Sequence, residues 1–360
     1  MKILYIGNYR DGTGWGNACV NNILAIDSVG IDVVPRAITF ENETQDYPTR
    51  VKELEQSSTE GCDVCIQHTL PHLYSYDGRY KNIGFAAVET SNFKDSGWHR
   101  HMNIMDEIWV PSTACREACI NSGVKVPVKV APHSLDVSQY VDNNGNKIQN
   151  LLNTFNFAFV GEFVERKNLK ALIRAFHMEF DYGEPVNLLI KTSKASLEDV
   201  QKYAAQIKMG LKIRQRYKEE IVIAGRLETT DYISVLSQCH SFVMPSRGEG
   251  FCIPALEAMA LGMPVIHTAS NGMDDFCYGA AVRSYSQPCF GTTDTLSNID
   301  TAKSDWREID IRALCSAMRK VFNRWVTGDM NKEKESAIER ASKYSHSSIG
   351  AQLKELLNDK

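Results

Sequence analysis

Short apolar runs alternate with helical stretches along most of this 360-residue chain, and the alternation occurs in two successive series. Strands that are separated by helices in this way predict a mostly parallel sheet with helices on both faces. Two such series, in a chain too long for one compact α/β domain, predict an α/β protein with two doubly wound, Rossmann-like domains. The expected strands are residues 2–6, 31–34, 63–67, 83–88, 107–111 and 126–131, and then 155–160, 186–191, 221–224, 241–244 and 265–267.

The expected helices lie between these strands and at the end of the chain. They are residues 17–29, 113–122, 169–176, 197–213, 230–238, 254–261, 332–343 and 348–357. A polar, turn-rich run at residues 142–147 predicts the domain boundary. We expect an N-terminal, acceptor-side domain at 1–148 and a C-terminal domain at 149–345. The last helix is expected in 346–360, and one option is that it packs back on the first domain. Doubly wound sheets bind ligands at the carboxyl ends of their strands, so we expect the reaction site in the cleft across which the domains face each other.

The composition is that of a globular protein. Apolar residues make up 43% of the chain and charged residues 23%, as in ordinary globular proteins, and no apolar run approaches the ~20 residues that span a bilayer. No signal peptide is apparent, so we expect a cytoplasmic protein whose ten cysteines are reduced. Cys62 and Cys65 have no second cysteine pair nearby, which favours buried thiols over a zinc site or a redox dithiol. The net charge is −4 and the first half is the more acidic, which disfavours nucleic acid as a partner.

One strand–turn–helix unit, residues 241–262, carries the strongest functional signal. Its helix is expected to begin at Pro254 and to stop at Gly262, where proline and glycine suit the two ends of a helix. Glu249 stands in the turn and Glu257 eight positions later in the helix. The backbone N–H groups of Gly250, Phe251 and Cys252 lie before the helix, where an anion binds readily. An anion with hydroxyl groups on both sides, such as a nucleoside-diphosphate sugar, fits this arrangement.

This unit resembles the E-x7-E segment of the family 4 retaining glycosyltransferases, which have the GT-B fold. Two further stretches, Asp-Glu-Ile-Trp-Val-Pro-Ser at 106–112 and Pro-His-Ser-Leu-Asp at 132–136, are similar to segments of that family. The likeness extends from Gly7 to about Met318, which is nearly the whole chain. It implies that Glu249 and the amides of Gly250, Phe251 and Cys252 hold the transferred sugar, while Glu257 holds the ribose of the donor nucleotide.

The loop at 161–168 supplies the positive charge that a departing diphosphate needs. The family usually has an arginine directly after the first glycine and a lysine five residues later. This chain keeps the lysine as Lys167 but has Glu162 in place of the arginine, and Arg166 is the candidate to supply the second charge.

Three glycines at 12, 14 and 16 follow the first strand and are expected to form a flexible turn. Their spacing differs from the dinucleotide fingerprint, but the resemblance places Gly14 and Gly16 near the donor phosphates or the acceptor. His68 and Glu89 each come at the carboxyl end of an expected strand. The resemblance implies that these two side chains order the acceptor hydroxyl or the sugar.

Together these features predict a retaining hexosyl- or pentosyltransferase that moves a sugar from a nucleoside-diphosphate sugar, of the UDP or GDP type, to an acceptor hydroxyl. The sequence has no Asp-x-Asp triplet and no metal-ligand cluster, so we expect metal-independent transfer without a further cofactor. A glycan is the expected acceptor, with a modified base in DNA as an alternative, and no stable membrane insertion is expected. Two further functions are alternative hypotheses: a nucleotide-sugar epimerase and a non-catalytic nucleotide-sugar-binding module.

Overall fold

The computed structural model describes residues 1–39, 45–140, 148–213, 216–290 and 302–359, which form two compact units. Unit 1 comprises Met1–Asp136, Thr295–Asp305 and Ser342–Lys360, and unit 2 comprises Val137–Asp294 and Trp306–Ala341. The expected boundary at 142–147 lies outside the described residues. The domain ranges predicted from the sequence therefore stay predictions, and each unit is described by itself.

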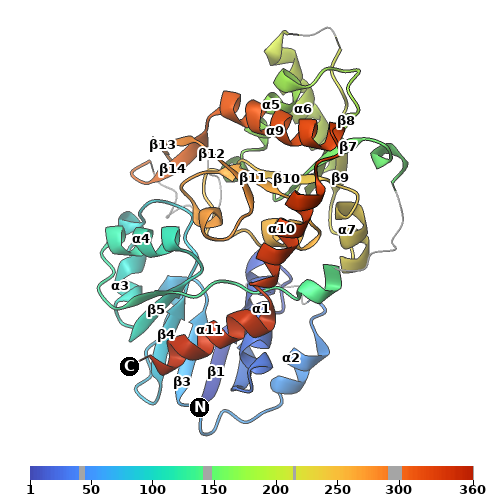
Figure 1. Cartoon of the computed structure of the whole chain (residues 1–360). Helices are drawn as coiled ribbons and strands as arrows, with labels where there is room; N and C mark the ends of the chain where they lie inside the picture. The colour runs from blue at the N-terminus through green and yellow to red at the C-terminus, as the bar shows by residue number, and fades with distance from the viewer. Residues whose placement is uncertain (40–44, 141–147, 214–215, 291–301, 360) are drawn as a thin grey trace. The chain divides into compact units, whose positions relative to one another are not determined.

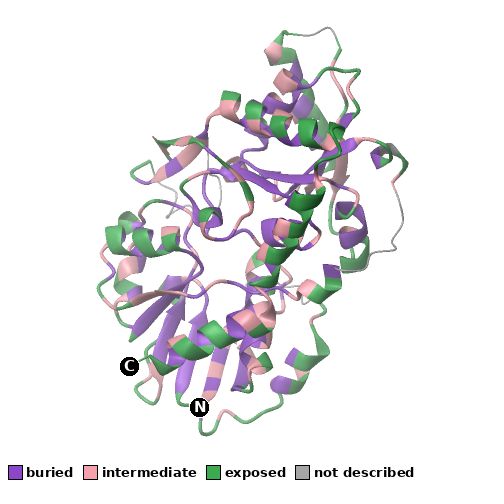
Figure 2. Ribbon diagram, in the orientation of Figure 1, coloured by how far each residue is buried: buried purple, intermediate pink, exposed green. Residues whose placement is uncertain are grey.

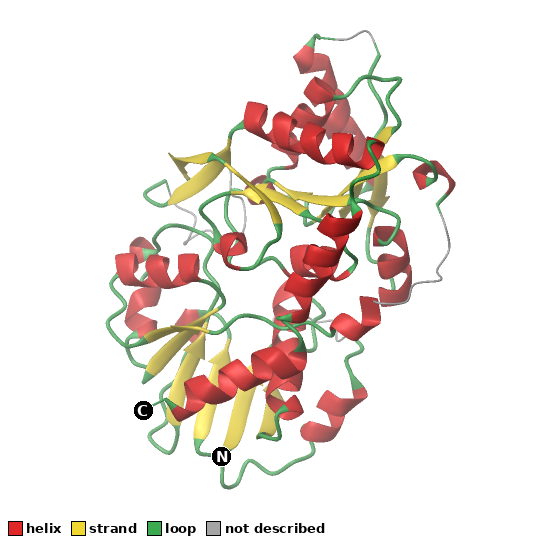
Figure 3. Cartoon of the chain, in the orientation of Figure 1, coloured by secondary structure: helices red, strands yellow, loops and turns green. Residues whose placement is uncertain are grey.

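Unit 1 is built on a six-stranded parallel sheet with the strand order β2-β1-β3-β4-β5-β6. Helices connect most of the successive strands, as Figures 1 and 3 show, whereas only a 3-10 turn lies between β3 and β4. The strands are β1 (Lys2–Gly7), β2 (Asp32–Ala37), β3 (Val64–His68), β4 (Lys81–Phe85), β5 (Glu107–Val110) and β6 (Val128–Val130), and the helices are α1 (Gly14–Ser28), α2 (Thr49–Leu54), α3 (Trp98–Met102) and α4 (Thr113–Ser122), with short 3-10 turns η1 (Pro71–Leu73) and η2 (Lys94–Ser96).

The last helix, α11 (His346–Asn358), returns to unit 1 and packs along α1. Ile349, Leu353 and Leu357 are buried in the same core as the side chains of β1 and α1. The two backbones approach closely at Gly350, where a Cβ atom would lie 2.2 Å from the carbonyl oxygen of Ala25. Only a residue without a side chain fits this crossing, so the end of the chain is an integral part of unit 1.

Unit 2 has a second six-stranded parallel sheet, with the order β12-β11-β10-β7-β8-β9, and a separate β13–β14 pair. Its strands are β7 (Phe155–Val160), β8 (Val186–Thr192), β9 (Ile221–Ala224), β10 (Ser241–Met244), β11 (Val265–Thr268), β12 (Gly279–Val282), β13 (Ser284–Pro288) and β14 (Asp305–Ile309). Its helices are α5 (Leu169–Glu179), α6 (Leu197–Leu211), α7 (Thr229–Leu236), α8 (Ile253–Ala260), α9 (Ile311–Val326) and α10 (Asn331–Ser342), with 3-10 turns η3 (Val137–Tyr140), η4 (Gln149–Leu151), η5 (Glu165–Lys167) and η6 (Gly272–Asp275).

The central strands are buried on both faces, which explains their continuous apolar sequences. All six residues of β7, Phe-Asn-Phe-Ala-Phe-Val, are buried, as are all four of β10 (Figure 2). Helices cover both faces of such a sheet, so strands without a polar face are expected. The two predicted doubly wound sheets are therefore confirmed.

One local prediction was wrong. Gly14 and Gly16 belong to α1 and not to a flexible turn, because the Thr13 hydroxyl accepts a hydrogen bond from the Gly16 N–H at 3.1 Å and starts the helix there. The prediction of buried thiols is confirmed, because Cys62, just before β3, and Cys65, within β3, are both buried free cysteines, like most of the ten.

Candidate active site

The candidate site of unit 2 lies where the order of its strands reverses. β7 and β10 are hydrogen-bonded neighbours, but the chain leaves β7 toward β8 and leaves β10 toward β11 on the opposite side. The connections that follow these two strands therefore run to opposite sides of the sheet, and the carboxyl ends at such a reversal are the usual ligand site of sheets of this kind. η5 follows β7, and the turn with Glu249 follows β10.

Glu249 is paired with both cations of the first loop. Its Oε1 atom lies 2.7 Å from Lys167 Nζ and 3.2 Å from Arg166 Nη1, and the carboxylate is buried. Burial alone would raise the pKa of the Glu249 carboxyl, but the charges of Lys167 and Arg166 outweigh it, and the pKa lies below its usual value. The structure thus brings three predicted site residues together in one ionised cluster.

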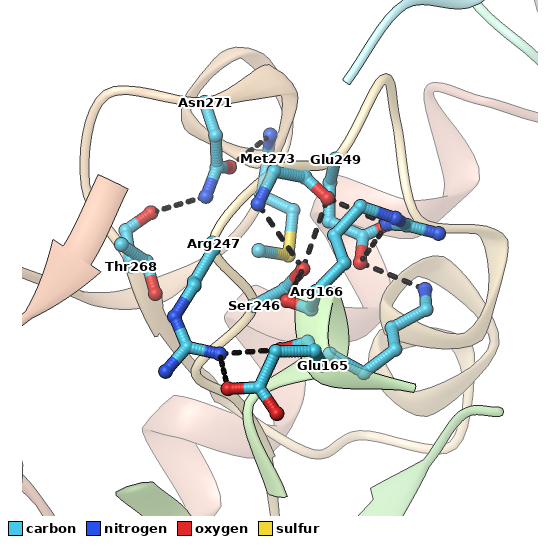
Figure 4. A network of polar contacts seen from close by, with 10 residues as sticks. Glu165, Arg166, Ser246, Arg247, Glu249, Thr268, Asn271 and Met273 are labelled. Atoms are coloured by element: carbon cyan, nitrogen blue, oxygen red, sulfur yellow. Dashed lines mark hydrogen bonds and ion pairs between the residues drawn. The ribbon is translucent and has the colours of Figure 1, made fainter. Parts of the chain in front are cut away.

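A second arginine ties the two loops to each other (Figure 4). Arg247 is 5% exposed, and its guanidinium donates to Glu165 Oε1 at 2.9 Å, as Figure 4 shows. It also donates to Glu308 Oε2 at 2.6 Å. The Arg247 N–H donates to the carbonyl oxygen of Arg166 at 2.8 Å, and Ser246 Oγ donates to the same oxygen at 3.2 Å. Because the bonds to Glu165 and to the Arg166 carbonyl cross from one loop to the other, they fix the position of η5 and with it that of the two cations.

The turn after Glu249 is held from its other side by η6. The Gly272 N–H donates to the carbonyl oxygen of Glu249 at 3.0 Å, and a Cβ atom on Gly272 would lie 2.2 Å from the carbonyl oxygen of Gly250. The Phe251 ring stacks on Phe276 at 4.2 Å between centroids. Cys252, with φ +87°, precedes α8 and lets the chain turn sharply into the helix. The segment predicted to face the sugar is therefore rigid.

Glu257 lies on α8 in a different polar environment. Tyr140 Oη donates to its Oε1 atom at 3.2 Å, and Tyr232 Oη donates to its Oε2 atom at 2.5 Å. Burial raises the pKa of the Glu257 carboxyl above its usual value, because these bonds and the charge of Lys191 offset the loss of hydration only in part. No motif in the sequence marks the two tyrosines, which come from distant segments.

The predicted residues of unit 1 lie at the carboxyl edge of its own sheet, where the strand order reverses between β1 and β3. His68 ends β3 and is 1% exposed, and its Nδ1 atom is 2.7 Å from Tyr5 Oη. Burial, and then the charge of His133, hold the pKa of His68 well below its usual value, so the imidazole is neutral. Glu89 is half-buried in the loop after β4.

The first turn of α1 lies at the same edge. Gly14 has open space around it, whereas a Cβ atom on Gly16 would lie 2.8 Å from Asp11 Oδ1. The close approach at Gly16 is thus to atoms of the protein itself, the Asp11 side chain and the Asn8 carbonyl oxygen. Roles for these glycines, for His68 and for Glu89 in binding or catalysis stay predictions.

Neither a metal centre nor a membrane span is found in the part of the chain that the structure describes. No three His, Cys, Asp or Glu residues among the described positions come together in a way that would hold a metal ion. No described helix combines the length and the apolar character needed to cross a bilayer.

Comparison with known proteins matches this unit to an enzyme family. Residues 142–277 match the family described as glycosyl transferases group 1. The serotype-specific mannosyltransferase WbdA of Escherichia coli is 29% identical over 254 residues, which cover 66% of this chain. The chain spans only 29% of the length of that relative. An uncharacterised glycosyltransferase of Methanocaldococcus jannaschii, MJ1178, is 29% identical over 123 residues, which are 34% of this chain and 31% of that protein.

Solved structures agree over the whole length. Anabaena HepE in complex with UDP and glucose has a TM-score of 0.66 at 16% identity, with 99% of each chain covered. The sucrose-phosphate synthase of Thermosynechococcus elongatus has a TM-score of 0.64 at 13% identity, with 99% of this chain and 98% of that chain covered. At such identities the likeness concerns the fold, and the predicted two-domain GT-B fold is confirmed.

Proposed function

We propose that this chain, of which residues 142–277 match the glycosyl transferases group 1, is a family 4-like, retaining glycosyltransferase which uses a nucleoside-diphosphate sugar. The observation that carries the proposal is the cluster of Glu249, Lys167 and Arg166 at the reversal of the strand order in unit 2. Two half-buried cations held by one buried carboxylate form a fixed positive site, and fixed charges of this kind stabilise a leaving diphosphate.

Different residues of unit 2 bind different parts of the donor. Lys167 and Arg166 bind the diphosphate, Glu249 and the turn after it hold the sugar, and Glu257 binds the ribose hydroxyls. The bond between the anomeric carbon and the diphosphate oxygen breaks, and the acceptor oxygen bonds to that carbon on the same face. The acceptor's proton passes to the diphosphate oxygen. Fixed protein charges take the part that a metal ion has in other transferases, so we propose transfer without a metal.

A hexosyl donor and a glycan acceptor are the proposed substrates. WbdA, which is similar in sequence, is described as a mannosyltransferase, and HepE, which is similar in fold, was solved with UDP and glucose. Mannose and glucose are both hexoses, and this supports a hexosyl donor. We propose UDP or GDP as the nucleotide. Transfer to a modified base in DNA, an epimerase and a binding module without activity are the competing functions.

Ligand-induced stabilisation tests the donor class and the site together. We would measure the melting temperature with UDP, GDP, ADP, CMP and NAD for the wild type, for Glu257→Ala and for Glu335→Ala, an exposed helix glutamate of unit 2 that serves as the control. A ligand at a hundred times its Kd adds about 2.7 kcal/mol of stability. We expect a shift with UDP or GDP in the wild type and the control, and none in Glu257→Ala. No shift with either nucleotide in the wild type would contradict the proposal.

The chemistry needs a second experiment. With the nucleotide known, its hexose donors are offered with short hexose oligosaccharides, and the product's anomeric configuration is determined by NMR. Retention supports the proposed mechanism and inversion contradicts it. Sugar conversion without any acceptor would favour the epimerase, and donor binding without hydrolysis or transfer would favour the binding module.

A further inference from the structure

The carboxylate of Glu257 is held by two neutral hydroxyl groups, whereas that of Glu249 is held by two cations. Tyr140 and Tyr232 each donate to a different oxygen of Glu257, at 3.2 and 2.5 Å. In the described part of the chain, Glu257 has no cation within ion-pair distance. The negative charge of Glu257 is therefore oriented by its partners without being neutralised by them.

Each Glu257 oxygen keeps a free site for a further hydrogen bond. An ionised carboxylate oxygen accepts about two hydrogen bonds, and a tyrosine takes one site on each oxygen. Two parallel acceptor sites suit two adjacent hydroxyl groups, which is the pattern of a ribose diol. Burial and the charge of Glu257 hold the pKa of Tyr232 well above its usual value, so its hydroxyl stays a donor.

We propose that Tyr140 and Tyr232 are positioning residues, which set the two oxygens of Glu257 as acceptors for the 2′- and 3′-hydroxyl groups of the donor ribose. This inference rests on the proposed function, because it takes Glu257 as the ribose-binding residue. A free glutamate side chain loses about 1.5–2 kcal/mol of rotamer freedom when it is fixed. Because the tyrosines fix the Glu257 side chain when the protein folds, this loss of entropy does not weaken the binding of the nucleotide.

The origin of Tyr140 adds a second consequence. Tyr140 ends η3, the first element of unit 2, and lies four positions after Asp136, the last residue of the first segment of unit 1. η3 packs against α8, the helix that carries Glu257. The segment by which the chain enters unit 2 therefore supplies one of the two donors that orient Glu257.

The test compares ribose and dideoxyribose nucleotides. Tyr140→Phe and Tyr232→Phe each remove one hydroxyl group, and Tyr285→Phe is the control, since Tyr285 is 57% exposed on β13. Kd is measured by calorimetry for UDP and GDP and for their 2′,3′-dideoxy analogues. We expect each site variant to bind the ribose nucleotide about tenfold more weakly. The dideoxy analogue should bind wild type and variants alike, and the control should match the wild type.

The outcomes separate this inference from the function on which it rests. Equal weakening for ribose and dideoxy ligands would show a merely structural role and overturn the inference. Unchanged affinity in both variants would overturn it too, while the proposed function stands. If the wild type binds neither UDP nor GDP, the proposed function is contradicted, and the inference that rests on it is overturned with it. The two tyrosines lie on different elements, so a variant that does not fold leaves the other as a complete test.

Discussion

Lys167 Nζ lies 2.7 Å from Glu249 Oε1, although 82 positions of sequence separate the two residues. The contact joins the loop after β7 to the loop after β10, and these strands are neighbours at the reversal of strand order. The topology, and not local sequence, thus brings a fixed cation and a fixed carboxylate to one point. Sugar and diphosphate, which part during the proposed reaction, would each meet one member of the pair.

Removal of the lysine charge should slow turnover more than it weakens binding. In Lys167→Met, Arg166 remains beside Glu249, but half of the positive charge that faces the leaving diphosphate is lost. We expect kcat for transfer or donor hydrolysis to fall about 10²–10³-fold, as when one preorganised donor is removed from a developing oxyanion. Lys170→Met, an exposed change three positions later on α5, should leave kcat unchanged. Equal rates for both variants would remove Lys167 from the proposed site.

Glu249 should contribute stability that depends on pH. Its folded-state pKa lies below the ordinary value of 4.5, so the ionised form is favoured in the folded protein. The contribution is present above about pH 4.5, where the unfolded carboxyl is ionised, and is lost as pH falls through the folded pKa. We expect the difference in unfolding free energy between wild type and Glu249→Gln, from urea titrations, to shrink below pH 4.5. A difference that grows toward acidic pH would contradict the assigned ion cluster.

The sequence predicts the central strands of both sheets well, since their apolar runs are continuous and glycine or proline bounds several helices. It does not predict β12 or β13. β12 is Gly-Ala-Ala-Val at the sheet edge, and β13 is Ser-Tyr-Ser-Gln-Pro, largely exposed. Strands of small or polar residues have no apolar pattern to detect. The expected elements also lack α9, although its N-cap residue Asp310 and the helical spacing of its buried apolar residues are signals that could have predicted it.

Some contacts of the candidate site follow from the sequence, and others do not. Glu249, Lys167 and Arg166 lie in two loops that the strand–helix pattern places at the carboxyl ends of strands, so their proximity follows from the predicted fold. The tyrosines on Glu257 could not be predicted, because Tyr140 is 117 positions away and has no motif around it. Arg247 stands inside the recognised segment, but its partner Glu308 is 61 positions away. Contacts between side chains of distant loops depend on backbone positions that no local pattern encodes.

A side chain at position 272 should disturb the turn that carries Glu249. A Cβ atom there would meet the carbonyl oxygen of Gly250 at 2.2 Å, and backbone atoms cannot swing aside as a flexible side chain does. We expect Gly272→Ala to lower the free energy of unfolding by about 1–3 kcal/mol and to weaken binding of UDP or GDP. Gly210→Ala on α6 has open space and should raise stability by about 0.5–1 kcal/mol. Equal stabilities of the two variants would show that the turn adapts freely.

Loss of the Arg247 side chain should have two effects: it should destabilise unit 2, and it should displace η5. Arg247→Met leaves Glu165 and Glu308 without the buried guanidinium that bonds to both, and breaking such a buried pair costs about 3–5 kcal/mol. The control is Arg283→Met, which removes an ion pair to Asp310 from an arginine that is 75% exposed and should cost at most about 1 kcal/mol. Urea unfolding measures both effects. Because η5 carries Lys167 and Arg166, the Arg247 variant should also bind UDP or GDP more weakly under conditions where it is fully folded. Full nucleotide affinity in a folded Arg247→Met protein would mean that η5 keeps its place without the arginine, and that the cations are positioned by Glu249 alone.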